Sequence, residues 1–344
     1  MKIVHLIFAF NTGGSETMLV DIANEQVKQA EVSVIIINKT YNKILLNKID
    51  KKVKIYFINR IESSKNPFPV YKLNILLLKL EATVLHCHNH NIIPLILPWL
   101  KKKAFLTLHC IGIPSKYLTQ YHRLFAISES VKKDVASRTK ITSVVVYNGI
   151  STKKISIKQD YTINDNFKII EVGRLDHSIK GQHLAIKALH LLKEKGISNI
   201  QLDLIGEGNS EPYLRELVEK YDLSNQVNFL GLKDREYIYS HLMDYDLLIQ
   251  PSLFEGFGLT VAEGMAAKLP ILVSDIDGPM EIIEQGKFGF HFRSGDPKKI
   301  VEQILYLTSH YKSKELELKV EESYKHAIEY FDIKKTAMNY IKNY

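Results

Sequence analysis

The sequence predicts an α/β protein built around two doubly wound parallel sheets. Three observations predict this class: a length of 344 residues, a composition that is 45% hydrophobic and 24% charged, and two successive series of apolar runs separated by helical patterns. The length allows two cores of ordinary size. Strands that alternate with helices form parallel sheets, so we expect two Rossmann-like domains.

The first series of strands occupies residues 1–150, the expected N-terminal domain. Its strands are expected at Lys2–Phe8, Val32–Ile37, Lys54–Ile58, Thr83–Cys87, Phe105–Leu108, Leu124–Ser128 and Val144–Tyr147. A glycine turn at residues 11–15 follows the first strand, and an amphipathic helix is expected at Glu16–Gln29 with Ser15 as its cap. The turn lacks the G-x-G-x-x-G fingerprint, so neither a nicotinamide nor a flavin cofactor is expected.

The second series follows a polar, lysine-rich segment, residues 151–166, which we interpret as a linker. Residues 167–330 form the expected C-terminal domain, with helices at Gly181–Lys195 and Pro212–Tyr221. Residues 331–344 are amphipathic and predict one closing helix. Domains of this kind bind ligands at the carboxyl ends of their strands, and we expect the two domains to face a shared cleft. The strands of the second domain are expected at Phe167–Val172, Gln201–Ile205, Val227–Leu230, Leu247–Gln250, Ile271–Ser274 and Gly289–Phe292.

Charge differs between the two halves. Residues 1–150 contain 21 Lys and Arg against 9 Asp and Glu, a surplus of +12, whereas residues 151–344 contain 25 against 29, a balance of −4. The basic half is expected to meet an anionic membrane surface or a phosphorylated substrate, although a solvated lysine-rich surface would have the same composition. No basic motif with interleaved aromatic residues indicates nucleic acid.

Apolar runs are too short to span a bilayer, and the first residues do not form a signal peptide. We therefore expect a cytoplasmic protein that is peripheral on the inner face of the membrane. Its two cysteines, Cys87 and Cys110, fit a reducing compartment without a disulfide.

The stretch from Glu255 to Glu263 is the strongest candidate for a ligand site. It follows the apolar run Leu247–Pro251, so a strand, a glycine turn and a helix N-terminus are expected in that order, an arrangement that binds anions. Glu255 and Glu263 only accept hydrogen bonds, which suits sugar hydroxyls. An alternative for Glu263 is purely structural, because Thr260 and Glu263 have the spacing of a helix capping box.

Two basic residues follow the first strand of the second domain. Arg174 and Lys180 lie between that strand and a helix, where both could contact a diphosphate; the alternative is a surface pair. His109 ends a strand of the first domain and is expected to face the same diphosphate, unless it is a hydrogen-bonded core histidine.

Two patterns could suggest a metal site. Strand alternation in His86-Cys-His-Asn-His90 would place three histidines on one face, and Asp275-Ile-Asp277 is similar to the D-x-D pair of some sugar transferases. Further ligands at structural-zinc spacing are missing from the sequence, and the aspartates lie within a turn, so no metal is expected. The sequence also lacks a P-loop and a G-x-S-x-G elbow.

Taken together, the motifs resemble those of the retaining glycosyltransferases of family 4, which have the GT-B fold. The resemblance covers essentially the whole length. Its landmarks are Asn11–Glu16, Leu108-His109, Ala126–Ser130, Asn148-Gly149, Gly173-Arg174 with Lys180-Gly181, Ile205–Gly208, the Glu255 to Glu263 spacing and Gly278–Glu281. Two departures are Asp277, where many members have a glycine, and the short segment Cys110–Tyr121 on the acceptor side.

The resemblance implies a role for each matching residue. Arg174 and Lys180 would hold the nucleotide diphosphate, Glu263 the ribose and Glu255 the transferred sugar. His109 would lie beside that sugar. The remaining matches are Phe257, Gly258 and Leu259, which would offer backbone amides, and Gly14, which would let the first domain's loop close over the diphosphate.

The function expected from this resemblance is metal-independent transfer of a sugar from a nucleotide donor, expected to be a UDP-sugar, to a surface polysaccharide, a lipopolysaccharide or another glycolipid. A nucleotide-sugar epimerase on the same fold is the alternative enzyme. A non-catalytic nucleotide-sugar-binding module is the third candidate, and it would tolerate loss of Glu255 and Lys180. Turnover of the donor without an acceptor would indicate the epimerase.

Overall fold

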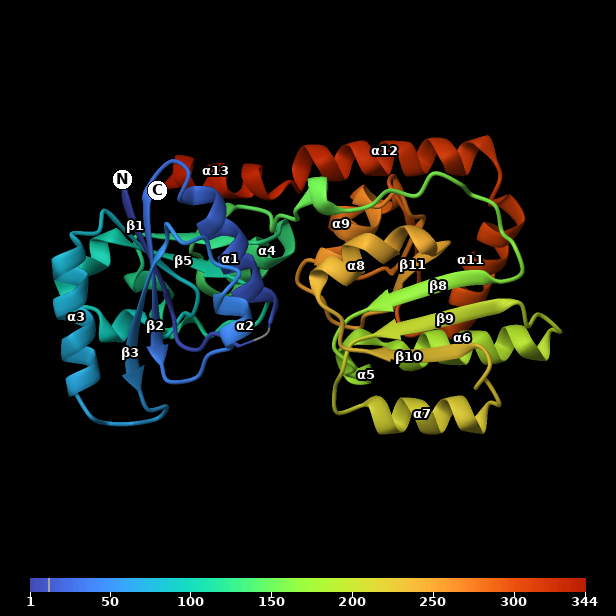
Figure 1. Ribbon diagram of the computed structural model, residues 1–344, viewed down its shortest axis with the longest axis horizontal. Helices are drawn as coiled ribbons and strands as arrows, with labels where there is room; N and C mark the ends of the chain where they lie inside the picture. Colours follow the sequence, from blue (N-terminus) through green and yellow to red (C-terminus); the bar gives the residue numbers. More distant parts are fainter. Residues whose placement is uncertain (12) are drawn as a thin grey trace. The chain divides into compact units, whose positions relative to one another are not determined.

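The computed structural model describes residues 1–11 and 13–344, which divide into two compact units. Unit 1 consists of Met1–Gly149 and Ile333–Tyr344, and unit 2 of Ile150–Asp332. Thr12, part of the expected turn after the first strand, lies outside the described residues. Each unit is built around one parallel sheet covered by helices (Figure 1). The expected fold class is therefore confirmed.

Unit 1 contains a seven-stranded sheet in the order β3-β2-β1-β4-β5-β6-β7. Its strands are near-continuous apolar runs, as is typical of sheets covered on both faces. The strands are β1 Lys2–Ile7, β2 Glu31–Asn38, β3 Lys54–Arg60, β4 Val84–Cys87, β5 Ala104–Leu108, β6 Arg123–Ala126 and β7 Val144–Val145. The helices are α1 Gly14–Gln26, α2 Lys43–Leu46, α3 Phe68–Leu80, α4 Glu129–Thr139 and α13 Ile333–Asn343, with 3₁₀ turns η1 Ile93–Leu95, η2 Pro98–Lys103 and η3 Ser115–Gln120.

Unit 2 contains a six-stranded sheet in the order β10-β9-β8-β11-β12-β13. Its strands are β8 Phe167–Val172, β9 Ile200–Ile205, β10 Val227–Gly231, β11 Leu247–Gln250, β12 Ile271–Ser274 and β13 Phe290–Phe292. The α-helices are α5 His177–Lys180, α6 Gln182–Glu194, α7 Glu211–Lys220, α8 Arg235–His241, α9 Leu259–Ala266, α10 Asp277–Ile282, α11 Pro297–His310 and α12 Lys314–Tyr330. The 3₁₀ turns are η4 Thr152–Lys154, η5 Leu242–Asp244 and η6 Glu284–Gly286. The longest of these helices, α12, has 17 residues. Among the described residues, no helix is both long and apolar enough to cross a membrane.

The expected linker, residues 151–166, packs onto unit 2 as part of its fold. The Lys158 Nζ donates to Asp246 Oδ1 at 3.1 Å, and both side chains are buried. The Lys158 backbone N–H also donates to the Ala267 carbonyl at 2.9 Å. This polar segment is therefore not a free connector, because one of its lysines forms a buried ion pair within unit 2. Unit 2 accordingly begins at Ile150.

The closing helix belongs to the first unit. α13 packs against α1, and the Thr336 hydroxyl donates to the Tyr147 carbonyl at 2.9 Å. A Cβ at Gly149 would lie 2.6 Å from the Ile333 Cα, so only glycine fits where this helix begins. The last residues of the chain thus complete the N-terminal unit, an assignment that their position in the sequence does not suggest.

The expected cap of the first helix is wrong. The N-cap of α1 is Gly13, without a side-chain hydrogen bond, and α1 begins at Gly14. The Ser15 hydroxyl instead donates to Glu16 Oε2 at 2.7 Å. The helix therefore begins two residues earlier than Glu16.

Candidate active site

The main candidate site of unit 2 lies at the carboxyl ends of β8 and β11. These neighbouring strands are where the strand order reverses, because β9 and β10 continue from β8 whereas β12 and β13 continue from β11. Doubly wound sheets bind ligands at such a switch point. Arg174 and Lys180 follow β8, and Glu255 follows β11. The topology therefore gathers the expected charged residues at one edge of the sheet.

Lys180 and Glu255 form the central contact of this site. The Lys180 Nζ donates to Glu255 Oε2 at 2.5 Å, and the two side chains are 24% and 17% exposed. Gln250, the last residue of β11, donates its Nε2 to the same oxygen at 3.4 Å and to the Thr260 hydroxyl at 3.2 Å. The Glu255 carboxylate is thus held between the Lys180 ammonium and the Gln250 amide. Lys180 is therefore not part of a loose surface pair, which was the alternative for this residue.

Glycines allow the loops of the site to approach one another. Gly181 has a φ of +75°, and a Cβ there would lie 1.9 Å from the Pro251 carbonyl oxygen. A Cβ at Gly278 would lie 2.5 Å from the Glu255 carbonyl oxygen. Both positions therefore require glycine for close backbone packing. The loop that carries Glu255 is fixed between α5 on one side and α10 on the other.

The helix that follows this loop begins at a left-handed residue. Gly258, at a φ of +104°, is the N-cap of α9, and no side chain caps the helix. The first turn of a helix leaves N–H groups without intrahelical acceptors, and these groups favour anions. Phe257, Gly258 and Leu259 lie at this end of α9 and could direct amides to a phosphate or a sugar.

The capping-box alternative for Glu263 is wrong. Thr260 lies inside α9 and its hydroxyl accepts from Gln250, so it is not the cap. Glu263 is only 6% exposed, and its Oε1 lies 3.9 Å from Arg235 Nε of α8. The burial of the Glu263 carboxylate near the Arg235 guanidinium is consistent with a role in binding ribose, and this role of Glu263 remains a proposal.

Arg174 differs from Lys180 in its exposure. Its side chain is 64% exposed, and its Nη2 lies 3.4 Å from Asp176 Oδ2, a weak contact. Its backbone is fixed, because Gln182 Nε2 donates to the Arg174 carbonyl at 3.0 Å. The guanidinium is therefore available to a ligand at the end of β8.

Two side chains at this site were not identified from the sequence. Gln250 orients Glu255, and Glu171 of β8 is buried with its Oε2 lacking a hydrogen-bond partner. Burial raises the pKa of the Glu171 carboxyl well above its usual range, and the charge of Lys180 offsets this only in part. The sequence did contain a signal for both residues, because each is a polar residue near the end of an otherwise apolar strand.

The expected site residues of unit 1 lie after β1 and β5. Gly14 is the first residue of α1, and a Cβ there would meet no described atom within 4 Å. Packing against the described residues therefore does not require glycine at position 14. The close approach of a ligand to Gly14 remains a proposal. His109 follows β5, and its Nε2 lies 3.3 Å from His88 Nδ1. Burial lowers the pKa of His109 to about 4, so the ring is neutral near pH 7.

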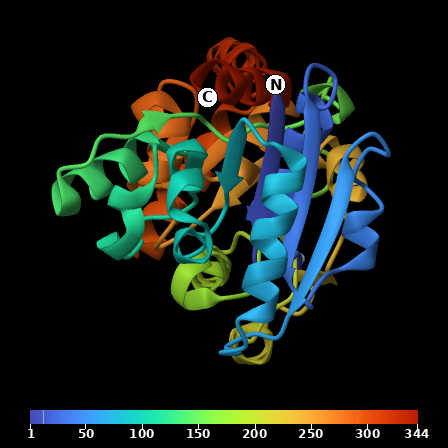
Figure 2. The same ribbon diagram turned by 90° about the vertical axis from the view of Figure 1, so that its left-hand side faces the viewer.

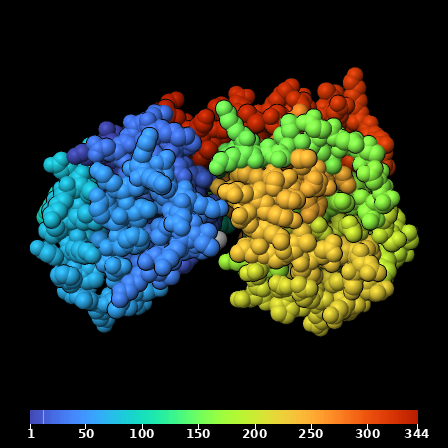
Figure 3. All heavy atoms as spheres, viewed as in Figure 1, coloured from blue at the N-terminus to red at the C-terminus, as the bar shows by residue number. Residues whose placement is uncertain are grey.

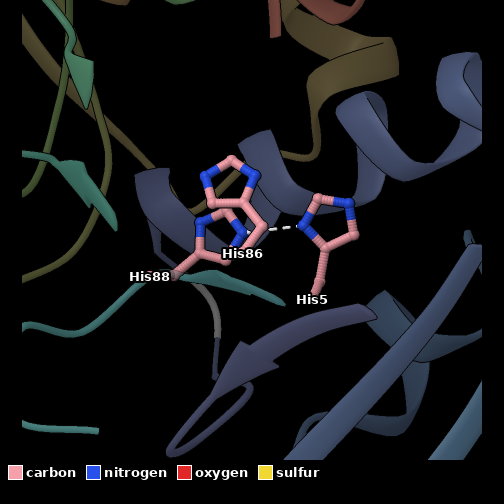
Figure 4. Close-up of side chains that lie close together, drawn as sticks. All are labelled: His5, His86 and His88. Carbon is pink, nitrogen blue, oxygen red and sulfur yellow. Dashed lines mark hydrogen bonds between the residues drawn. The ribbon is translucent and has the colours of Figure 1, made fainter. Parts of the chain in front are cut away.

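The expected histidine face is composed differently from the prediction. β4 ends at Cys87, a buried free thiol, so both His88 and His90 lie beyond the strand, and His90 does not join the cluster whereas His88 does. His5 of β1 joins His86 and His88 instead, because His5 and His86 are directly paired in the sheet (Figure 4). Sequence reasoning missed His5 because it lies about eighty residues away in the chain.

This histidine cluster has the residue types of a metal site but also a full set of protein partners. One nitrogen of each of His5, His86 and His88 lies within 4.8 Å of the others. The rings of His86 and His88 are stacked at 22°, and both nitrogens of His86 contact hydroxyl groups, those of Tyr344 and Thr107. The cluster is better described as part of a hydrogen-bond network.

Comparison with solved structures identifies the fold. The chain is similar to the Anabaena protein Alr3699/HepE, whose crystal structure is a complex with UDP-glucose, with a TM-score of 0.82 and 20% identity. The similarity covers 100% of this chain and 99% of that one. At this identity it shows the fold alone, which is the GT-B fold of two Rossmann-like units.

Sequence relatives are also glycosyltransferases by name. An uncharacterized glycosyltransferase of Methanocaldococcus jannaschii is 30% identical over 201 residues, 54% of this chain and 51% of the relative. The capsular polysaccharide biosynthesis glycosyltransferase CapM of Staphylococcus aureus is 29% identical over 195 residues, 53% of this chain and 50% of the relative. The match therefore spans about half the length of each of these relatives.

Two family models match consecutive parts of the chain. The model described as Glycosyltransferase Family 4 matches residues 12–154, and the model described as Glycosyl transferases group 1 matches residues 153–326, more than half of the chain. The second match includes both candidate carboxylates and both candidate basic residues of unit 2. The chain belongs to the glycosyl transferases group 1 family.

Proposed function

We propose that this protein is a retaining glycosyltransferase that moves a sugar from a UDP-sugar to a surface polysaccharide or glycolipid acceptor. The observation that carries the proposal is the Lys180–Glu255 pair at the switch point of unit 2, beside the N-terminus of α9. An ammonium, a carboxylate and backbone amides at one strand edge match the needs of a sugar diphosphate. The choice of UDP is supported by the similarity of the fold to Alr3699/HepE, which was crystallised with UDP-glucose.

In this proposal the positive groups stabilise the leaving diphosphate. As the glycosidic bond breaks, positive charge grows on the sugar and negative charge on the phosphate. Arg174, Lys180 and the amides of Phe257, Gly258 and Leu259 would balance the phosphate charge, so we expect no metal requirement. A test is turnover in excess chelator, where a loss of activity restored by Mg²⁺ would contradict this part of the proposal.

The two carboxylates would accept hydrogen bonds from hydroxyl groups on both sides of the diphosphate. Glu255 would accept hydrogen bonds from the transferred sugar, and Glu263 from the ribose. The acceptor hydroxyl would attack from the face that the diphosphate leaves and transfer its proton to the departing phosphate, which retains the anomeric configuration. Gly14 and His109 of unit 1 would approach the diphosphate and the sugar.

The proposal is tested first by ligand-dependent stability. A ligand that binds only the folded state raises stability by mass action. Thermal unfolding with UDP-, GDP- and ADP-sugars should show an increase of the unfolding temperature with the uridine donors, and Lys180→Met should reduce this increase. An equal response to all three bases, or none, would contradict the assignment of the donor.

The reaction class is tested by acceptor dependence. Release of UDP should rise strongly when a glycan acceptor is supplied, and the sugar should appear on that acceptor. Interconversion of the donor sugar without acceptor would identify an epimerase instead. Donor binding without any turnover across a panel of glycan acceptors, unchanged in Glu255→Gln, would identify a binding module.

We also propose that unit 1 docks on an anionic membrane through the outer face of α3. This α3 face carries Phe68, Tyr71 and Leu78, which are 66%, 65% and 44% exposed, and the exposed Lys72 and Lys79. The helix α3 itself lies toward the viewer in Figure 2 and at the edge of unit 1 in Figure 3. Apolar rings flanked by lysines suit the boundary between headgroups and acyl chains. The proposed site of action is the cytoplasmic face of the membrane.

The only tryptophan reports on this docking. Trp99 of η2 is 60% exposed and precedes Lys101–Lys103. η2 is tied to α3 because the Leu97 N–H donates to Asn74 Oδ1 at 2.9 Å. Binding to anionic vesicles should therefore shift the Trp99 fluorescence to shorter wavelength.

Vesicle flotation separates this proposal from simple solvation of the basic surface. The double variant Phe68→Ser with Tyr71→Ser should lose most of its binding to anionic vesicles at low salt. The matched control is Leu318→Ser on unit 2, which is 55% exposed and should bind like the wild type. Equal binding by all three proteins would place the contact elsewhere, and no binding by the wild type would overturn the docking proposal.

A further inference from the structure

A continuous hydrogen-bond network of eight side chains runs through the core of unit 1. It connects the histidine cluster of Figure 4 with two helices that pack against each other, α1 and α13. In order, its members are His109, His88, His5, Gln26, Tyr344, His86, Thr107 and Tyr340.

The first half of the network connects His109 to α1. His109 Nε2 lies 3.3 Å from His88 Nδ1, and His88 Nε2 lies 3.1 Å from His5 Nδ1. His5 Nε2 lies 2.8 Å from the carbonyl oxygen Oε1 of Gln26, the last residue of α1. His5 and Gln26 are fully buried, and His88 is 4% exposed. Water therefore has little access to these contacts.

The second half connects Gln26 to α13. The Gln26 Nε2 donates to the Tyr344 hydroxyl oxygen at 3.2 Å, and the same hydroxyl contacts His86 Nδ1 at 2.6 Å. His86 Nε2 contacts the Thr107 hydroxyl at 2.7 Å, and Thr107 donates to Tyr340 at 3.1 Å. Since the only proton of Thr107 is used in that bond, its oxygen accepts from His86. His86 therefore carries its proton on Nε2.

All four histidines of the network are neutral near pH 7. Burial lowers the pKa of His5 and His109 to about 4 and the pKa of His86 and His88 well below the usual range. A neutral imidazole has one donor and one acceptor nitrogen. When such rings are bonded in series, the protonation of one ring therefore determines the protonation of the next.

The amide of Gln26 sets the direction of this series. Its Oε1 only accepts, so His5 must carry its proton on Nε2 and accept on Nδ1. His88 then donates from Nε2 to His5 and accepts on Nδ1. His109 in turn donates from Nε2 to His88, which leaves His109 Nδ1 as an unprotonated acceptor.

We propose that Gln26 is a positioning residue that fixes the tautomer of His109 through His5 and His88, so that His109 Nδ1 is held as a hydrogen-bond acceptor. If the proposed function holds, that nitrogen accepts from a hydroxyl of the transferred sugar. The Tyr344 hydroxyl supports this role, because it accepts a hydrogen bond from Gln26 Nε2. This bond opposes a half-turn rotation of the Gln26 amide group, which would exchange Oε1 and Nε2 and so reverse every donor and acceptor from Gln26 to His109.

The direct test is the tautomer of each histidine in ¹⁵N-histidine-labelled full-length protein without any substrate. Long-range ¹H–¹⁵N NMR correlations distinguish a ring protonated on Nε2 from one protonated on Nδ1. The wild type should show His5, His86, His88 and His109 as Nε2–H tautomers. A His109 protonated on Nδ1 in the wild type would overturn the proposal, and so would a spectrum that shows a metal-bound imidazole in the cluster.

Two variants test the control exerted by Gln26. Gln26→Met keeps the side-chain volume but removes both amide groups, so His109 should become a mixture of tautomers. Gln29→Leu replaces an exposed glutamine just past the end of α1 and should leave the spectrum unchanged. An unchanged His109 tautomer in a folded Gln26→Met protein would overturn the proposal. Should Gln26→Met not fold, Tyr344→Phe is the second variant, and it should broaden or split the His109 signals.

Kinetics then separate this inference from the proposed function. The tautomer measurement needs no donor or acceptor, so it stands or falls without glycosyl transfer. With transfer established, Gln26→Met should lower turnover about tenfold, the value of one hydrogen bond, while UDP affinity stays unchanged. Equal turnover in wild type and variant would refute the link between His109 Nδ1 and the sugar.

Discussion

Neutralising Glu255 should change nucleotide affinity and turnover in opposite directions. Lys180 Nζ lies 2.5 Å from Glu255 Oε2 in a half-buried pair. At an effective dielectric constant of about 20, this distance corresponds to an attraction of roughly 6–7 kcal/mol before desolvation. Desolvation offsets most of it, so we expect a coupling energy of about 1–3 kcal/mol.

This coupling predicts the behaviour of the two single variants. Glu255→Gln should release Lys180 to the diphosphate and remove a repelling charge, so UDP affinity should rise a few-fold. Turnover should nevertheless fall by roughly 10²–10³-fold, because a contact to the reacting sugar is lost. Lys180→Met should instead weaken UDP binding about tenfold or more, since a charge-assisted hydrogen bond is lost.

The assay combines calorimetric UDP titration, initial rates and urea unfolding for both single variants and the double variant. The unfolding free energies give the coupling energy of the pair in a double-mutant cycle. The reasoning would be refuted if Glu255→Gln weakened UDP binding as much as Lys180→Met does, because Glu255 would then contact the nucleotide rather than the sugar.

Three further predictions concern other parts of the fold. Glu263→Gln should lower UDP affinity about tenfold while stability changes by about 1 kcal/mol or less, because glutamine keeps the size of the side chain and one oxygen acceptor. Arg235→Gln, at the residue 3.9 Å from Glu263, should leave UDP affinity within about threefold, and equal losses in calorimetry would argue against a ribose contact. Gly181→Ala should destabilise unit 2 in urea unfolding by several kcal/mol more than the control Gly196→Ala. Gly196 has a similar φ but open space around an added Cβ, so its substitution should cost about 1–2 kcal/mol. Similar losses for the two variants would mean that the Gly181 loop adjusts freely. The free energy of unfolding should fall by about 3 kcal/mol through His5 alone as the pH is lowered from 6.5 to 4. The unfolded chain binds a proton on this ring near pH 6.5, whereas the folded chain binds it only near pH 4. An unfolding free energy that stays constant over this pH range would contradict a buried neutral His5.

The sequence was sufficient for the strands and for the loops of the site. Buried parallel strands are near-continuous apolar runs, so every expected strand has a counterpart in the structure, with small differences at the ends. Glycines in the loops that follow β8 and β11 are also visible in the sequence, and two of them, Gly181 and Gly258, adopt the positive φ values that glycine allows. The order of strands then placed Lys180 and Glu255 at one edge.

Features that depend on distant parts of the chain were not predictable in this way. The pairing of His5 with His86 depends on sheet register, which no local pattern encodes. The packing of α13 on unit 1 depends on contacts with α1, although the helix follows unit 2 in the chain. The capping-box alternative for Glu263 is excluded because α9 begins at Leu259, with Gly258 as its N-cap, so Thr260 already lies inside the helix. Local motifs therefore located the site, and tertiary contacts determined how its side chains are held.

The central claim is retaining sugar transfer from a UDP-sugar at the site of Lys180 and Glu255. It is tested most directly by ¹H NMR of the anomeric proton during turnover of a UDP-α-sugar with a glycan acceptor. We predict an α-linked product from the wild type, and almost no product from Glu255→Gln even though that variant binds UDP. A β-linked product, or full activity of Glu255→Gln, would contradict the account.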